Sequence, residues 1–266
     1  MTDTLTPPRD YLLEHLVAVP AFRALLRSIE ARMIGEREWQ RPILDLGCGD
    51  GHFAQAAFTQ PLDAGIDPSA PALAEARRRG MHRDLRLGDS GAMPFPDGAF
   101  ATVLSNSVLE HIPDIDATLR ETHRVLKPGG VFVFTTPNQH YAEYMFFADL
   151  FNRLGWRGFA ARYGAFFNRI AHHYRTDSQE VWSARLERFG FRVRECQTYF
   201  SRDASHTFDL AHYYSAPTIL FKFLLGRWII APWRANFILI EPRLRRYYNE
   251  PPADDGASLF FVCERK

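Results

Sequence analysis

A turn with glycine at every second position closes the sequence Ile43-Leu44-Asp45-Leu46-Gly47-Cys48-Gly49-Asp50-Gly51. The apolar run before the turn predicts a short buried strand, and residues 52–60 continue as a helix. Glycine permits positive φ and a close approach of the backbone to a ligand, and the following helix begins with free N–H groups. The pattern therefore predicts a strand, a ligand-binding turn and a helix in succession.

Strands and helices continue to alternate after this turn. Apolar and β-branched runs predict further strands at 62–66, at Leu85 and Leu87, at 100–105 and at 131–136. Helical periodicity predicts helices at 69–79 and at 114–126, the second ending at Lys127-Pro128-Gly129-Gly130. Such alternation is typical of a parallel, doubly wound α/β sheet.

The regions on either side of this core follow other patterns. Residues 10–36 are helical in pattern, and Pro20 splits them into two helices. The alternation breaks after Pro137, although residues 178–189 return as a helix. We divide the chain into a helical cap (1–40), an α/β core (41–138), a cap insertion (139–175), a core helix and sixth strand (176–202), a hydrophobic and basic insertion (203–256) and a last core strand (257–266).

Composition excludes several classes of protein. The net charge of +1, from 32 Lys and Arg against 31 Asp and Glu, excludes a globally basic nucleic-acid binder. Cys48, Cys196 and Cys263 lie too far apart for a disulfide scaffold or a cysteine metal cluster. The sequence shows no secretory pattern at its start and no run of 18 uncharged apolar residues. We therefore expect a cytoplasmic protein.

The spacing of the glycines distinguishes this turn from the turn of a dinucleotide-binding site. A dinucleotide fingerprint, G-x-G-x-x-G, that began at Gly47 would place its third glycine at position 52, which is His52. The spacing here is G-x-G-x-G, and it follows Asp45. This departure argues against a dehydrogenase. Asp67 comes 20 residues after Gly47, the spacing at which a carboxylate reaches ribose hydroxyls in such sheets.

Five motifs in order resemble those of the class I S-adenosylmethionine (SAM)-dependent methyltransferases. They are the segments 45–51, 65–69, 88–95, 100–114 and 126–130. The resemblance implies a seven-stranded, mostly parallel sheet with an antiparallel last strand and α-helical cap insertions. It also implies that the glycine turn lies beneath the amino-acid end of SAM and that Asp89 contacts the adenine amino group. The expected cofactor residues are Asp45, Gly47, Cys48, Gly49, Gly51, Asp67, Pro68, Asp89, Ser90 and Asn106.

Methyl transfer from a sulfonium needs mainly positioning, and a base only where the acceptor must lose a proton. His111 follows the strand at 100–105 and stands beside Glu110, so this pair is the first candidate for such a base. The alternative is that both residues cap the loop. His140 follows the next strand and is expected to face the acceptor, or else to pack within a cap helix.

No metal site is expected. The segment from Leu109 to Asp114 also resembles the ubiquinone-pathway O-methyltransferases, in which an upstream carboxylate joins Glu and His around a metal. Ser107 stands at that upstream position here. His172 and His173 are adjacent, and adjacent residues on a helix point apart.

Charge is segregated along the chain. Residues 43–140 hold 12 acidic and 8 basic residues, whereas 151–176 and 210–240 hold no acid at all. Aromatic residues and arginines interleave in both acid-free stretches, a pattern that could suit single-stranded nucleic acid. The neutral total and the lack of an RNA-binding motif argue against a nucleic-acid partner. Residues 210–246 are expected either to form a buried cap or to contact a membrane peripherally.

The expected function is methylation, by SAM, of a small-molecule acceptor. O-methylation of a hydrophobic or lipid-linked compound fits the apolar insertions best. One alternative is an anionic sugar or nucleotide acceptor bound by the arginines. A second is a SAM-binding interaction module without catalysis.

Overall fold

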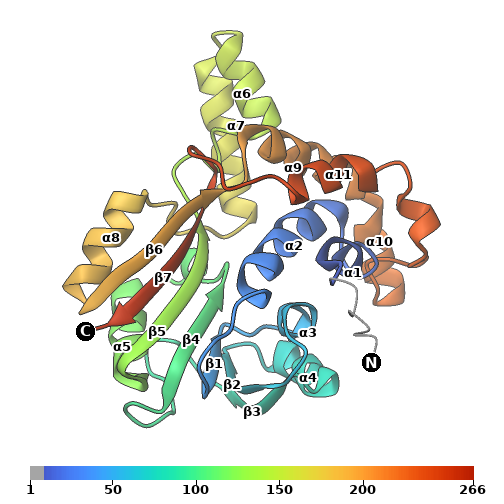
Figure 1. The fold of residues 1–266 in the computed structure, drawn as a ribbon. Helices are drawn as coiled ribbons and strands as arrows, with labels where there is room; N and C mark the ends of the chain where they lie inside the picture. Colours follow the sequence, from blue (N-terminus) through green and yellow to red (C-terminus); the bar gives the residue numbers. More distant parts are fainter. Residues whose placement is uncertain (1–8) are drawn as a thin grey trace, which may run out of the picture.

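The chain folds around one sheet of seven strands, as the computed structural model of residues 9–266 shows (Figure 1). The strand order is β3-β2-β1-β4-β5-β7-β6. Only β7 runs antiparallel to its neighbours. The strands are β1 (Ile43–Leu46), β2 (Leu62–Asp67), β3 (His82–Leu87), β4 (Phe100–Asn106), β5 (Leu126–Pro137), β6 (Phe191–Tyr199) and β7 (Ser258–Arg265). The predicted fold class is confirmed.

Helices cover both faces of the sheet and extend beyond one end of it (Figure 1). They are α1 (Tyr11–Leu16), α2 (Ala21–Gly35), α3 (His52–Ala57), α4 (Ala70–Arg79), α5 (Ile115–Val125), α6 (Phe146–Arg153), α7 (Arg157–Ile170), α8 (Gln179–Arg188), α9 (Arg202–Ser215), α10 (Pro217–Leu225) and α11 (Glu241–Tyr248). Pro20 separates α1 from α2 as predicted, because it is the N-cap residue of α2.

The core has two apolar clusters, one on each face of the sheet. Side chains alternate along a strand, so β5 gives Phe132 and Phe134 to one cluster and Val133 to the other. Trp182 of α8 packs with the two phenylalanines and is fully buried. All seven residues of β4 are buried, as expected of a central strand covered on both faces.

Strand β5 begins earlier than the sequence predicted. The segment Lys127-Pro128-Gly129-Gly130, expected as a turn, lies within β5 as an irregularity in its pairing with β4. Phe100 pairs with Leu126 and Thr102 pairs with Val131, so the extra residues bulge out between the two pairs. Residue 129 has φ +73° in this bulge, a conformation that favours glycine over other residues.

The two insertions are helical. Helices α6 and α7 project together from the top of the molecule in Figure 1, and α9 packs against α2 and α6. Residues 203–256, in which the sequence showed no regular alternation, form α10, α11 and most of α9. Helix α10 could not be located from the sequence. Its residues, PTILFKFLL, are apolar around nearly the whole helix, so they show no helical periodicity. None of the helices within residues 9–266 is long and apolar enough to cross a bilayer.

Candidate active site

The glycine turn lies at the carboxyl end of β1, beside the point where the strand order reverses. Gly47 has φ +75°, and a Cβ there would come within 2.4 Å of Val108 Cγ1. Gly49 has φ +54°, and a Cβ there would meet no described atom within 4 Å. A side chain at position 47 would clash with the loop after β4, so this position requires glycine. The backbone at Gly49 faces open space instead.

Asp67 ends β2 and is fixed against this turn. Its Oδ2 accepts a hydrogen bond from Gly49 N at 2.9 Å, and its Oδ1 accepts one from Ser69 N at 2.8 Å. A carboxylate has about four lone-pair sites, so two remain for further donors. Asp67 and the open side of Gly49 together form a cradle suited to a nucleoside with free hydroxyls.

The other predicted cofactor residues differ in what they contact. Asp89, in the loop after β3, accepts a hydrogen bond from Gly91 N at 2.6 Å, and Ser90 Oγ is paired with Thr118 Oγ1. Gly51 is the N-cap of α3, Cys48 is buried, and Pro68 is exposed. These side chains border the glycine turn and the ends of β2 and β3.

Asp45 and Asn106 are occupied by protein partners. Asp45 is buried and lies 2.8 Å from His82 Nε2. The Asn106 amide accepts from Thr135 Oγ1 and donates to Glu30 Oε2. Both residues therefore hold the strand ends together in this structure.

Sequence reasoning missed Glu30, a fully buried carboxylate on α2. It accepts four hydrogen bonds, from its own helix, from the end of β4 and from the end of β6. The donors are Arg27 Nη1 at 2.9 Å, Asn106 Nδ2 at 2.9 Å, Ser107 Oγ at 2.6 Å and Tyr199 OH at 2.9 Å. Glu30 thus holds α2 over the carboxyl end of β4. The only signal in the sequence is an acid beside Ile29 on the apolar stripe of the helix.

A cavity of about 440 Å³ opens between α2, α7, α9 and the carboxyl ends of β4 and β5. Its walls are mostly apolar and include Phe22, Leu26, Tyr141, Phe167, Ile170 and Phe208. Ser107, Glu110, His111 and His173 line one side of it. Its other polar lining residues include Arg23 and Arg27 of α2 and His212 of α9. Ser107 and Val108 join this cavity to the glycine turn, because Val108 contacts Gly47.

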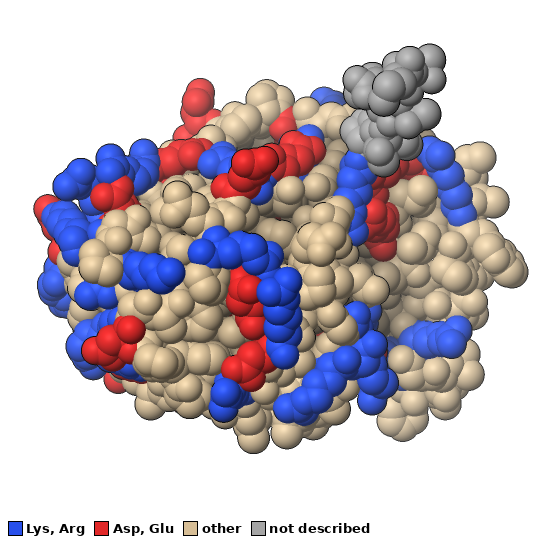
Figure 2. Space-filling model, turned by 60° about the horizontal axis from the view of Figure 1, so that its bottom comes forward, with Lys and Arg blue, Asp and Glu red and all other residues tan. Residues whose placement is uncertain are grey.

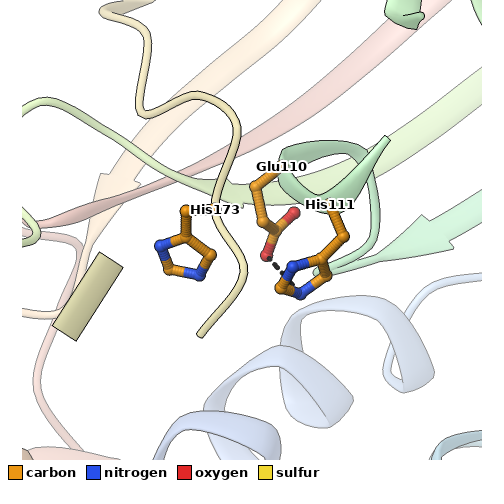
Figure 3. A group of neighbouring side chains, drawn as sticks. All are labelled: Glu110, His111 and His173. Carbon is orange, nitrogen blue, oxygen red and sulfur yellow. Dashed lines mark ion pairs between the residues drawn. The ribbon is translucent and has the colours of Figure 1, made fainter. Parts of the chain in front are cut away.

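Glu110, His111 and His173 form a polar cluster on one side of the cavity (Figure 3). Glu110 Oε1 lies 3.9 Å from His111 Nε2, and the two imidazole rings lie 5.3 Å apart between centroids. Glu110 is buried, and its Oε2 has no hydrogen-bond partner among the described residues. The carboxylate therefore has bonding capacity left for a bound ligand.

His173 reaches this cluster because residues 171–175 leave the helix. Helix α7 ends at Ile170, and His172 takes φ +55°, so the pair is not helical and the predicted divergence of its side chains does not apply. The Arg175 guanidinium donates to the carbonyls of Leu109, Ile112 and Pro113. This clamp fixes the acid-free insertion to the loop after β4, where His173 lies beside the Glu110 carboxylate.

Burial sets the protonation of these groups. It raises the pKa of Glu110 to about 8 and lowers the pKa of His173 to about 4. It also lowers the pKa of His111. His111 Nδ1 lies 3.2 Å from the carbonyl oxygen of His172, to which it can donate. In that tautomer the neutral ring keeps Nε2 free to accept a proton.

The same cluster could hold a divalent cation. The ligand atoms of Glu110, His111 and His173 all lie within 4.8 Å of one another, and carboxylate with imidazole is a common donor set. Ser107 is not part of it, because its hydroxyl donates to Glu30. His140 lies elsewhere: it is 3.2 Å from Glu143 Oε2 and stacks on Tyr144, while its neighbour Tyr141 lines the cavity.

Comparison with known proteins identifies a methyltransferase domain in the core of the chain. Residues 44–134 match the family described as "Methyltransferase domain". The malonyl-[acyl-carrier protein] O-methyltransferase of Yersinia pestis is 34% identical over 104 residues, covering 39% of each chain. The ubiquinone biosynthesis O-methyltransferase of Pseudomonas aeruginosa is 33% identical over 113 residues, covering 40% of this chain and 48% of its own. The chain thus spans less than half the length of these two curated relatives.

Solved structures extend the likeness of the fold to nearly the whole chain. A SAM-dependent methyltransferase of Thermotoga maritima superposes with a TM-score of 0.54 at 18% identity, covering 96% of this chain and 93% of its own. Phosphoethanolamine N-methyltransferase 2 of Haemonchus contortus, solved with S-adenosylhomocysteine, gives a TM-score of 0.55 at 18% identity, covering 93% and 53%. At such identities the likeness concerns the fold alone.

Proposed function

We propose that this chain, a class I SAM-dependent methyltransferase, transfers the methyl group of SAM to a hydroxyl group of a hydrophobic small molecule. The observation that carries the proposal is the mostly apolar cavity lined by His111, which lies in the same loop as Val108, the residue packed against Gly47 of the glycine turn. A hydrophobic acceptor fits the apolar walls, and its hydroxyl fits the side lined by His111.

Gly47, Gly49, Asp67 and Asp89 would hold SAM, which supplies an already activated methyl group. Asp67 would accept from the ribose hydroxyls through its two remaining lone-pair sites. The open side of Gly49 would let the amino-acid end approach the backbone. Asp45 and Asn106, which are paired with protein groups, would support this site by fixing the ends of β1 and β4.

His111 would take the acceptor proton. Its free Nε2 accepts the hydroxyl hydrogen while the acceptor oxygen bonds to the methyl carbon and the carbon–sulfur bond breaks. The thioether leaves uncharged, and the proton remains on His111. Above its pKa of about 8, the ionised Glu110, 3.9 Å away, would stabilise the imidazolium of His111. The apolar walls would exclude water during transfer.

A methyl-transfer assay with labelled SAM tests this function. The acceptors are phenols with apolar tails of increasing length, compared with sugar phosphates and nucleotides. We expect turnover on the apolar phenols, unchanged by a chelator, because proton transfer to His111 needs no metal. Turnover confined to the anionic acceptors would replace the proposal with the alternative in which arginines bind the acceptor. Arg23, which lines the cavity, would then be the first residue to test.

A further inference from the structure

We propose that α10 and residues 226–239, here called the α10 face, dock on a bilayer that contains anionic lipids and place the cavity beside it. The inference deepens the proposed function, since it names where a lipid-soluble acceptor would enter. The docking itself can be measured without SAM or acceptor.

The α10 face exposes large apolar side chains that the fold does not cover. Helix α10 has no buried residue. Phe223 is 83% exposed, Leu239 is 92% exposed and Trp233 is 69% exposed. Other exposed apolar residues of this face are Ile219, Leu220, Leu224, Leu225, Ile230 and Ile238. So many exposed large apolar side chains within one segment favour a surface that contacts a partner or a membrane.

The charges of the α10 face are all positive. Residues 210–240 contain no Asp or Glu, and their cations are Lys222, Arg227 and Arg234. Arg234 is paired with Glu241, whereas Lys222 and Arg227 make no ion pair with any residue in 9–266. In Figure 2, basic and acidic side chains are mixed over most of the visible face. The right-hand edge, where α10 and residues 226–240 lie in Figure 1, is mostly uncharged, with isolated basic side chains.

This combination favours anionic lipid over a second copy of the chain. A two-fold contact through the α10 face would bring its unpaired cations together with no acid within the face to offset them. Lipid headgroups supply negative charge, and the acyl region accepts Phe223 and Leu239. Helix α10 has nine residues, too few to span the hydrocarbon core, so the contact would lie at the interface.

The α10 face continues into the wall of the cavity. Trp228 lines the cavity together with Ile170 of α7 and His212 of α9. The Lys222 ammonium lies 5.9 Å from the centre of the Trp228 ring, so this wall begins directly beside α10. A bilayer under α10 would therefore lie next to the cavity, and a lipid-soluble acceptor could enter without crossing water.

Vesicle flotation with the full-length chain tests the docking. The vesicles are phosphatidylcholine with or without about 30% phosphatidylglycerol, without SAM. We expect binding to the anionic vesicles that weakens with added salt. The double variant Lys222→Glu, Arg227→Glu should bind the anionic vesicles more weakly, by about fivefold or more for each positive charge removed. The double variant Phe223→Ser, Leu239→Ser should not bind them. Matched controls on the opposite side are the exposed residues Val181 of α8, changed to Ser, and Arg192 of β6, changed to Glu.

Three outcomes would overturn the docking. They are no binding to anionic vesicles, equal binding of the α10 and control variants, and a wild-type dimer in solution that Phe223→Ser with Leu239→Ser converts to monomers. Because α10 buries none of its residues, substitution at Phe223 should leave the thermal unfolding midpoint unchanged. SAM binding in the absence of vesicles is measured in parallel. A chain that binds SAM but not vesicles would refute the docking and leave the proposed function standing.

Discussion

The Nε2 atom of His111 lies 3.9 Å from Oε1 of the buried Glu110, on the wall of a mostly apolar cavity. The loop after β4 supplies both residues, and Arg175 clamps the first insertion to that loop. The base candidate is thus positioned jointly by the α/β core and by the first insertion.

His111→Ala should lower turnover by about a hundredfold to ten-thousandfold, the range typical of a lost general base. SAM affinity should stay unchanged, because His111 lies on the acceptor side of the site. Steady-state kinetics and calorimetry measure the two quantities. The matched control is His140→Ala, which should keep full turnover since His140 contacts Glu143 and Tyr144 instead. A variant without His111 that turns over normally would remove it as the base.

The pH profile should show an acid limb below pH 6.5. Burial lowers the pKa of His111, so the neutral base is present throughout the neutral range and is lost only as the pH falls through that lowered pKa. The pKa of Glu110 is about 8, so raising the pH through 8 places a charge beside His111 and strengthens it as a base. Glu110→Gln should remove this second rise while keeping the acid limb. A flat profile from pH 5 to 9 would contradict the assignment.

Glu30→Ala should destabilise the fold by about 3–5 kcal/mol, because it leaves the partly buried Arg27 without its ion-pair partner and three further donors without their acceptor. Glu30→Gln should cost less, since an amide oxygen still accepts from Ser107 or Tyr199. Urea unfolding gives both values. Glu75, an exposed partner of Arg78 on α4, is the control, and Glu75→Gln should not shift the midpoint. Equal effects at positions 30 and 75 would rule out a structural role for the network.

The two glycines of the turn should respond differently to alanine. Gly47→Ala places a Cβ against Val108 and should disrupt the fold, measured as a lower unfolding midpoint. Gly49→Ala meets no described atom and costs only about 1–2 kcal/mol of backbone strain at φ +54°. It should leave the chain folded but weaken SAM binding, because the new methyl group occupies the open side. Unchanged SAM affinity in a folded Gly49→Ala variant would mean that the ligand does not approach there.

Much of the sheet could be predicted because its signals are local. The apolar strand before Gly47 and the alternation up to residue 137 each depend on a few neighbouring residues. The bulge at 127–130 was missed because its pairing depends on β4 rather than on its own turn-forming residues. Helix α10 was not located because an all-round apolar helix has no periodicity.

The candidate site was harder to predict, since its parts come together only in three dimensions. His111 and Glu110 were identified from their place after β4, and the structure puts both at the cavity. His173 joins them from more than 60 residues away along the chain, through a turn that the sequence does not signal. Glu30 was missed because a single acid in an amphipathic helix usually points to solvent, whereas this one is buried under four donors.

The most direct test of the account is a calorimetric titration of the chain with S-adenosylhomocysteine. We predict one site with micromolar affinity, weakened by about tenfold to a hundredfold in Asp67→Ala, which loses hydrogen bonds from ribose to a charged acceptor. Asp84→Ala, an exposed carboxylate on β3 paired with Arg86, should bind like the wild type. The absence of binding in a folded wild-type chain, or equal affinity in the two aspartate variants, would contradict the cofactor site on which the account rests.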